Sequence, residues 1–118
     1  MTTPVGPYAP VVRAGDWLVV SGQVGLKDGK LVSGGTQDQL RQAIDNVRVL
    51  LEGEGASLAS VVKTTVFLHH MSDYKATNET YMTAFGDHRP ARSAVGVAEL
   101  PLNALVEIEA WAWTGSPS

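Results

Sequence analysis

The stretch PARSAVGVAELPLNALVEIEAWAW, residues 90–113, constrains the fold more than any other part of the chain. It holds two segments with strand patterning, residues 91–98 and about 105–113, which ELPLNA connects. Side chains alternate between the two faces of a sheet along a strand, so every second residue of a segment shares a face. We predict that the two segments pair as a hairpin, because their connection is short.

Burial sets the register of this predicted hairpin. The helix-covered face of the sheet needs large apolar side chains, which the first strand supplies at Val95 and Val97. The second strand supplies Val106 and Ile108. Matching the two sets places Val95 opposite Ile108 and Val97 opposite Val106, because a slip by one residue would expose one of the sets.

The other face of the hairpin carries a mixture of charged, small and aromatic residues: Arg92, Ala94, Gly96, Glu107, Glu109, Trp111 and, at the end of the strand, Trp113. Tryptophans beside small residues form an apolar patch, which usually marks a surface that contacts a partner. We therefore expect a homo-oligomer that associates through the sheet face away from the helices.

The same register separates two charged residues of this face. Arg92 and Glu107 lie about four strand positions apart, or about 13 Å at a rise of about 3.3 Å per residue. We expect the two residues to act in one site only if they come from neighbouring subunits.

The segment before this stretch is built from a strand and two helices. SVVKTTVFL, residues 60–68, is dense in β-branched residues and predicts a buried strand. The helix before it is expected to start at an N-cap Thr36, with Gln39 completing a capping box, and to end at Gly53 and Gly55. Its buried face carries apolar residues at helical spacing: Leu40, Ile44, Val47 and Leu51.

A second helix is expected after that strand. Ser72 or Asp73 caps its start, and Gly86 ends it. Its apolar side carries three aromatic residues: Tyr74, Tyr81 and Phe85.

The N-terminal part adds short strands at about residues 10–13 and 17–24, and Asp28-Gly29 predicts a tight hairpin turn. The order β-β-β-α-β-α-β-β predicts an α+β fold, with one mixed sheet and two helices packed on one of its faces. We expect a single domain over residues 1–118 with a loose C-terminal tail from about residue 115.

Composition narrows the classes of function. The chain has 118 residues, of which 44% are hydrophobic and 18% charged, which is typical of a soluble globular domain. It has no cysteine, so disulfides, thiolate metal ligands and a cysteine nucleophile are excluded. No apolar run approaches the length of a membrane helix, and the N-terminus lacks the pattern of a signal peptide. The net charge of −3 and scattered basic residues argue against nucleic acid. We expect a cytoplasmic protein without membrane or nucleic-acid partners.

Three residues of the opening stretch are candidates for chemistry. The guanidinium of Arg92 can bind both oxygens of a carboxylate, or it can form a structural ion pair with Glu107 or Glu109 of a neighbour. The two glutamates share a strand face, so each can raise the pKa of the other and support general acid–base catalysis. Alternatively one of them is ion-paired across the interface, which is the preferred interpretation for Glu109.

Further candidates lie outside that stretch. Tyr8 can place its hydroxyl over a cleft, or its ring can pin the terminal segment. In SGQVG, residues 21–25, a glycine either lets the backbone approach a ligand closely or marks a β-bulge. His69 and His70 are adjacent at a strand end and are expected to point to opposite faces, and His88 stands alone. We therefore expect no metal site.

Several separated motifs resemble the RidA family, also called YjgF/YER057c/UK114, over nearly the whole chain. The interval between Arg92 and Glu107, 107 − 92 = 15, fits the family pattern as well. The matching segments are PARSAVGVAELPLNALVEIEA (90–110), GPYAP (6–10), LVVSGQVG (18–25), and DNVRVLLEGEGASLASVVKTTVFL (45–68) followed by NETYMTAF (78–85).

The resemblance implies a chorismate-mutase-like fold and a homotrimer whose sheets form a central barrel, with three clefts at the subunit interfaces. Many such proteins are enamine/imine deaminases. They hydrolyse reactive 2-imino acids such as 2-iminobutanoate and 2-iminopropanoate, which PLP-dependent dehydratases release, to 2-keto acids and ammonia. No cofactor is needed.

The resemblance also assigns roles to residues of this chain. Arg92 is similar to the arginine that binds the substrate carboxylate, and Glu107 to the acid that positions or activates water. Tyr8 and Asn78 resemble residues that line the cleft, and Gly22 resembles a backbone contact to the substrate.

Ala94 departs from the family pattern, because many relatives have cysteine or threonine at this position. The departure affects the expected fit of the substrate more than the expected chemistry. Two other functions stay open: a non-catalytic sensor of small carboxylates, and the RNA cleavage or translation inhibition attributed to some relatives.

Overall fold

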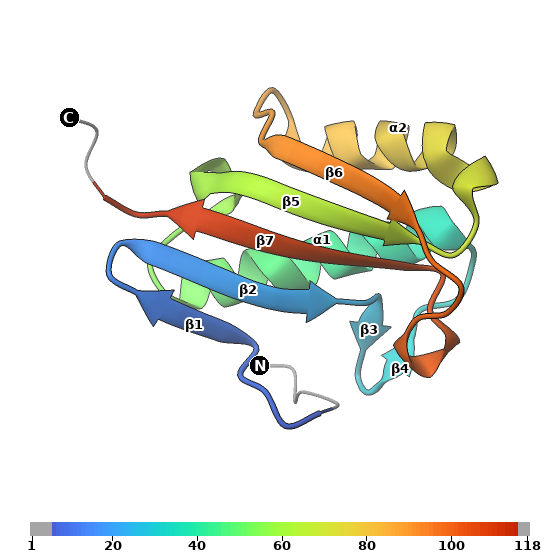
Figure 1. The fold of residues 1–118 in the computed structure, drawn as a ribbon, viewed down its shortest axis with the longest axis horizontal. Coiled ribbons are helices and arrows are strands. Elements are labelled where there is room, and N and C mark those ends of the chain that lie inside the picture. The colour runs from blue at the N-terminus through green and yellow to red at the C-terminus, as the bar shows by residue number, and fades with distance from the viewer. Residues whose placement is uncertain (1–5, 116–118) are drawn as a thin grey trace.

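A five-stranded sheet organises residues 6–115, the part of the chain that the computed structural model describes (Figure 1). The strands lie in the spatial order β1-β2-β7-β5-β6. Their bounds are β1 Val11–Ala14, β2 Trp17–Gln23, β5 Val61–Leu68, β6 Ala91–Gly96 and β7 Val106–Trp113. The predicted α+β class with one mixed sheet is confirmed, because β5 and β6 are parallel and the other pairs antiparallel.

A small ribbon of two strands, β3 (Leu26–Lys27) and β4 (Lys30–Leu31), stands apart from the main sheet. The turn between them is formed by Asp28 and Gly29, which both have positive φ. This conformation is the one that a tight hairpin turn requires, so the turn predicted at this dipeptide is confirmed.

The strands β6 and β7 do not pair with each other, and the predicted hairpin is wrong. β5 lies between them, parallel to β6 and antiparallel to β7. The connection ELPLNA, which contains the 3-10 turn η3 (Pro101–Asn103), passes around the end of β5 instead. There the N–H of His69 donates to the carbonyl of Leu105, and the N–H of Val97 donates to the carbonyl of Leu68. A short connection between two strands therefore does not require them to be neighbours.

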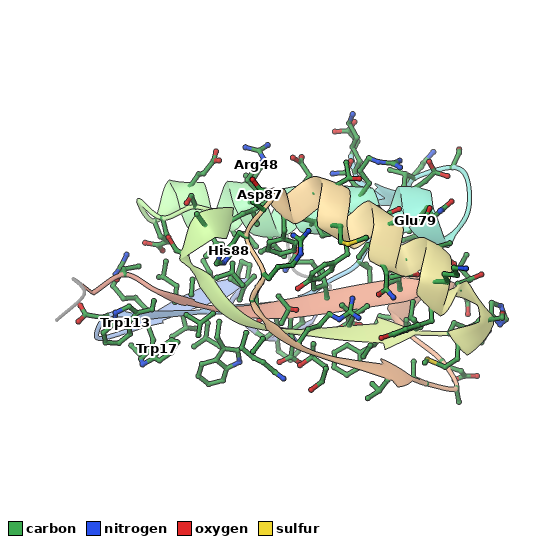
Figure 2. The ribbon with its side chains drawn as sticks, turned by 90° about the horizontal axis from the view of Figure 1, so that it is seen from above. Trp17, Arg48, Glu79, Asp87, His88 and Trp113 are labelled. Atoms are coloured by element: carbon green, nitrogen blue, oxygen red, sulfur yellow. The ribbon has the colours of Figure 1, made fainter. Side chains whose placement is uncertain are left out.

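Two helices cover one face of the sheet, as predicted (Figure 2). α1 spans Thr36–Gly53 and α2 spans Tyr74–Phe85, with 3-10 turns η1 (Leu58–Ser60) and η2 (Met71–Asp73) before β5 and α2. The four apolar residues expected on the inner face of α1 are all buried: Leu40, Ile44, Val47 and Leu51.

The start of α1 differs from the prediction by one residue. The N-cap is Gly35 rather than Thr36, and the carboxylate of Asp38 accepts the Gly35 N–H at 3.2 Å. The hydroxyl of Thr36 is used elsewhere, since it donates to the carboxylate of Asp73 at 2.6 Å and ties α1 to the start of α2. The predicted end of α2 is confirmed: Gly86 follows it with φ of 64°.

The core lies between the helices and alternate residues of the central strands. On β7 the inward residues are Val106, Ile108, Ala110 and Ala112, and all are buried. Burying an aliphatic side chain of valine or isoleucine size contributes about 1.5–3 kcal/mol, which decides which face of β7 turns inward. Glu107, Glu109, Trp111 and Trp113 consequently occupy the open face, as predicted.

The predicted faces of β6 are reversed in the structure. Arg92 lies beside Thr64, and Ala94 beside Val66, and these β5 residues are buried under the helices. Val95 faces the open side and is 41% exposed. The reversal follows from the pairing with β5, because residues side by side on neighbouring strands share a face. The space beside Gly96 on this face is narrow, since a Cβ there would come within 2.7 Å of Met71.

Within residues 6–115, no helix combines the length and apolar character needed to cross a membrane. The predicted C-terminal tail lies, from residue 116, outside the described residues, and so do the first five residues of the chain.

Candidate active site

Arg92, at the edge of the sheet, lies against two aromatic rings of α2. Its Nη2 donates a hydrogen bond to the hydroxyl of Tyr74 at 3.1 Å. Its Cζ lies 4.9 Å from the ring centroid of Tyr81 and 5.6 Å from that of Tyr74. Both distances are within the range of cation–π attraction. The side chain of Arg92 is thus bounded by two tyrosines of α2.

The guanidinium of Arg92 has no acidic partner within residues 6–115. Arg13, Arg41 and Arg48 all form ion pairs with carboxylates, and Arg89 donates to the carbonyls of Gly86 and His88. A guanidinium that contacts only neutral groups keeps donors for the two-pronged binding of a carboxylate. Within one chain, the alternative of an ion pair with Glu107 or Glu109 is not formed.

Asn78 lies on the same helix, four residues after Tyr74 and three before Tyr81. This spacing places it on the helical face from which both rings contact Arg92. Its Oδ1 is buried and accepts no hydrogen bond from the residues described. Buried acceptors are nearly always paired, so Asn78 is suited to accept an N–H from a ligand.

Glu107 stands on the open face of β7. Burial raises the pKa of its carboxyl, and the nearby negative charge of Glu109 raises that pKa further. The expected effect of Glu109 on the pKa of Glu107 is therefore present, with burial as the larger cause. A carboxylate whose pKa is raised toward neutrality is a better proton acceptor at physiological pH.

Gly22 lies against the carboxylate of Glu107. The pairing of β2 with β7 shifts between Val20 and Gln23, which is the bulge that the glycine pattern allowed. A Cβ at Gly22 would displace the Glu107 carboxylate from its present position, so the glycine lets this carboxylate lie against the backbone of β2. The interpretation of this glycine as a bulge is confirmed, and the approach of its backbone to a ligand stays a prediction.

Tyr8 lies in a segment that runs past the same strand. The Oγ of Ser21 donates to the carbonyl of Ala9 at 2.6 Å, and the N–H of Ser21 donates to the carbonyl of Pro10 at 2.9 Å. These bonds hold the segment in place, while the side chain of Tyr8 stays 45% exposed. The bonds of Ala9 and Pro10 thus place the segment that carries Tyr8 beside Ser21, the residue before Gly22.

The candidate residues form two groups on opposite faces of the sheet. Arg92 and Asn78 belong to the helix side, whereas Glu107 and Gly22 belong to the open side. Because β5 separates β6 from β7, Arg92 lies beside Thr64, whose partner on β7 is Ala110. The predicted register, with Val95 opposite Ile108, would have placed Arg92 opposite Trp111. One chain therefore does not bring the guanidinium and the Glu107 carboxylate together.

Ala94 lies two residues beyond Arg92 on the helix side, partly buried against the hydrophobic core.

The aromatic pair Tyr74 and Tyr81 was assigned from the sequence only to the apolar side of α2. Their interval of seven residues places two rings on one helical face, but the partner of that face depends on the order of the strands.

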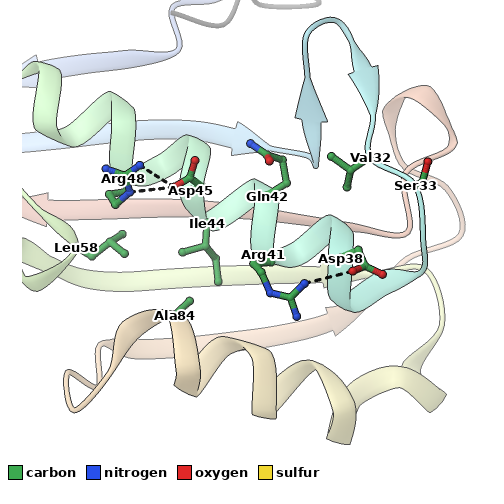
Figure 3. A pocket seen from close by; sticks show the side chains of 10 residues that line it. All are labelled: Val32, Ser33, Asp38, Arg41, Gln42, Ile44, Asp45, Arg48, Leu58 and Ala84. Atoms are coloured by element: carbon green, nitrogen blue, oxygen red, sulfur yellow. Dashed lines mark hydrogen bonds and ion pairs between the residues drawn. The ribbon is translucent and has the colours of Figure 1, made fainter.

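A groove lies on another part of the surface, along α1 (Figure 3). It has a volume of about 530 Å³ and is lined by charged residues in alternation, with Arg41 bound to Asp38 and Arg48 bound to Asp45. Its arginines are already neutralised by carboxylates of their own helix. It therefore offers no free charge comparable to that of Arg92.

The histidines differ in one respect from the expectation. The rings of His69 and His70 lie against each other at an angle of 58°, with centroids 4.2 Å apart, instead of pointing to opposite faces. No third acidic or histidine side chain joins them in a metal-binding arrangement within the described part of the chain.

Comparison with known proteins connects this arrangement to a family. The family model described as endoribonuclease L-PSP matches residues 1–114. A RutC family protein of Pyrococcus horikoshii is 44% identical over 112 residues, which cover 93% of this chain and 89% of the relative. A mouse protein named 2-iminobutanoate/2-iminopropanoate deaminase is 43% identical over 113 residues, 94% of this chain and 84% of the relative.

The fold has close counterparts among solved structures. The crystal structure of Escherichia coli TdcF with bound serine superposes with a TM-score of 0.90 at 34% identity, covering 95% of this chain and 91% of that one. The chain therefore belongs to the endoribonuclease L-PSP family, which includes the RutC and RidA proteins that its motifs resemble.

Proposed function

We propose that this protein hydrolyses reactive 2-imino acids, such as 2-iminobutanoate and 2-iminopropanoate, to 2-keto acids and ammonia. The observation that carries the proposal is the guanidinium of Arg92, which is held by neutral groups and lacks an acidic partner in residues 6–115. The name of the mouse relative and the serine bound to the bacterial one support a substrate of amino-acid type.

The proposed reaction needs little beyond positioning. Arg92 binds the substrate carboxylate through two parallel N–H···O bonds. The carbon of a protonated imine is already electrophilic, so a water held beside it attacks without covalent catalysis. Glu107 accepts a proton from that water, and its raised pKa suits this step.

The tetrahedral intermediate then collapses. The proton taken by Glu107 is returned to the nitrogen. The C–N bond then breaks as the C=O bond of the 2-keto acid forms, ammonia leaves, and the hydroxyl proton of the intermediate passes to Glu107, which releases it to the solvent. One water is consumed and no electron is transferred. Backbone N–H groups near Gly22, which approach Glu107 without a side chain between, are suited to stabilise the developing oxygen charge.

Assembly is part of the proposal, because the two groups of candidate residues face away from each other in one chain. We propose a homotrimer with a sheet barrel at its centre and a site at each subunit interface, where Arg92 of one subunit meets Glu107 of the next. The open face supports this assembly, since it exposes Trp111 and Trp113 beside Val12.

The activity is tested by competition with semicarbazide. An amino-acid oxidase generates the imine, and semicarbazide traps it at a measurable rate. The protein should lower the yield of semicarbazone, and Arg92→Ala should abolish this effect, by at least about a hundredfold in kcat/KM, while the oligomer stays intact. Full activity of Arg92→Ala would contradict the site, and an inactive wild-type protein would contradict the function.

If the protein does not hydrolyse imines, a sensor of small carboxylates is the next candidate function. Calorimetric binding of 2-ketobutyrate, lost in Arg92→Ala, together with a negative imine assay, would assign the protein to that class. The site would then bind the carboxylate without hydrolysing an imine.

RNA cleavage is a second candidate only because of the description of the family model. The arginines of α1, Arg41 and Arg48, are neutralised by carboxylates of the same helix, which does not favour phosphate binding. Salt-sensitive binding of single-stranded RNA, measured by fluorescence anisotropy, would favour this candidate over the first.

A further inference from the structure

The position of the Tyr81 ring is fixed independently of any ligand. Tyr81 is 4% exposed, and its hydroxyl shares a hydrogen bond of 2.7 Å with the buried hydroxyl of Thr64. Thr64 is also the β5 residue directly beside Arg92. The ring that lies under the guanidinium is therefore anchored to the neighbouring strand, and it cannot move away from Arg92 without breaking a buried hydrogen bond.

Tyr74 holds the guanidinium from a second direction. It is 39% exposed, so its side chain lies at the surface and not in the core. That hydroxyl accepts one N–H of Arg92, and the centroid of the ring lies 5.6 Å from the guanidinium carbon, within cation–π range. Two contacts from α2 and one neighbour on β5 thus surround a side chain that otherwise has many rotamers.

We propose that Tyr74, together with the anchored ring of Tyr81, is a positioning residue that sets the plane of the Arg92 guanidinium for carboxylate binding. The inference rests on the proposed function, because it takes Arg92 as the group that binds the substrate carboxylate. An arginine has five N–H donors in a planar fork. Tyr74 uses one of them, and the remaining donors are then presented together in a fixed plane.

The energetic benefit is pre-orientation. An arginine that is already held in its binding rotamer loses less conformational entropy when the carboxylate arrives. The benefit is realised in binding more than in the chemical step. A loss of Tyr74 should therefore raise KM and the Kd for a 2-keto acid, with little change in kcat.

Tyr74→Phe tests the hydroxyl and keeps the ring. We expect the Kd for 2-ketobutyrate, measured by calorimetry, to rise about three- to tenfold, which corresponds to one hydrogen bond. Tyr74→Leu removes the ring as well and should weaken binding further. Thr83→Ala is the matched control, because it removes a hydroxyl of α2 that bonds only to the helix carbonyl of Glu79. It should leave the Kd unchanged.

A double-mutant comparison separates positioning from a merely structural role. Arg92→Lys keeps the charge and loses the planar fork. In that background, Tyr74→Phe should change the Kd by less than twofold, because there is no guanidinium to orient. An equal loss in both backgrounds would overturn the inference, as would an unchanged Kd in Tyr74→Phe.

The same titrations distinguish failure of this inference from failure of the proposed function. Binding by wild type that is weakened by Arg92→Lys but not by Tyr74→Phe leaves the carboxylate site standing and rejects the role of Tyr74. No binding of 2-ketobutyrate by the wild-type protein would reject both. The imine assay measures turnover separately, since calorimetry measures binding alone.

Discussion

Arg92 differs from the other arginines of the chain in what surrounds it. The ion pairs of Arg41 and Arg48 are exposed, on one helix, and contribute little to stability. Arg92 instead lies between tyrosines at the sheet edge, where its charge is not used by the fold. A charged group that the fold holds but does not neutralise is a strong candidate for ligand binding.

Glu107 is the second such residue, and its pKa yields a prediction of pH dependence. As the proton acceptor it must be deprotonated, so kcat/KM should rise with pH through its pKa, which burial and Glu109 raise above the ordinary value for glutamate. Glu109→Gln removes the second cause. The acid limb of the pH–rate profile should then move to lower pH.

The profile of Glu109→Gln should be recorded beside that of wild type, with 2-iminobutanoate as substrate. A shift of the acid limb to higher pH, or none, would contradict the role of Glu107 as the base. Glu79→Gln, on α2, is a suitable control that changes the net charge equally. It should leave the acid limb in place.

At the scale of the elements, buried polar side chains of α1 hold the segments that flank the sheet. The Oε1 of Gln39 accepts the N–H of Leu105, at the start of the connection into β7. The Nδ2 of Asn46 donates to the carbonyls of Val24 and Leu26, on either side of the Gly25 turn into the ribbon. The helix thereby positions the end of β2, the strand that carries Gly22, and the start of β7, the strand that carries Glu107.

Asn46→Ala should destabilise the fold. The substitution removes two buried hydrogen bonds, although the Val24 carbonyl keeps the one from the Leu26 N–H. The cost is about 1–3 kcal/mol, which corresponds to a fall of about 5–15 °C in the Tm. Thermal unfolding followed by circular dichroism measures this change. Gln42→Ala is the control, since it removes only the bond from Gln42 to Asn46, and a similar fall there would contradict the assignment.

At the scale of the whole molecule, the two faces of the sheet have different surroundings. The helix face is covered within the chain, whereas the open face exposes a cluster of tryptophans. Trp17 packs edge-on against both Trp111 and Trp113, with ring centroids 6.0 and 5.0 Å apart. Figure 2 shows Trp17 and Trp113 on the side away from the helices. Such an aromatic surface is the natural contact for a second copy of the chain.

Trp111→Glu should convert the proposed trimer to a monomer, because a charge in the centre of an apolar interface has no partner. Light scattering after size-exclusion chromatography measures the mass. Imine hydrolysis should be lost together with the assembly, since Arg92 and Glu107 then remain on opposite faces of separate chains. Val49→Glu is matched in exposure, 45% against 43%, and lies on α1, so it should leave the mass unchanged.

The sequence by itself determined the elements, the buried face of α1, the inward residues of β7 and the candidate residues for the proposed chemistry. These follow from local periodicity, turn residues and motifs, which depend on neighbours along the chain. Only the tertiary structure decided that β5 separates β6 from β7 and that Arg92 faces α2. Strand order and the face of an edge strand depend on which distant segments pack together, and small residues such as Ala94 and Gly96 leave both faces equally compatible with burial.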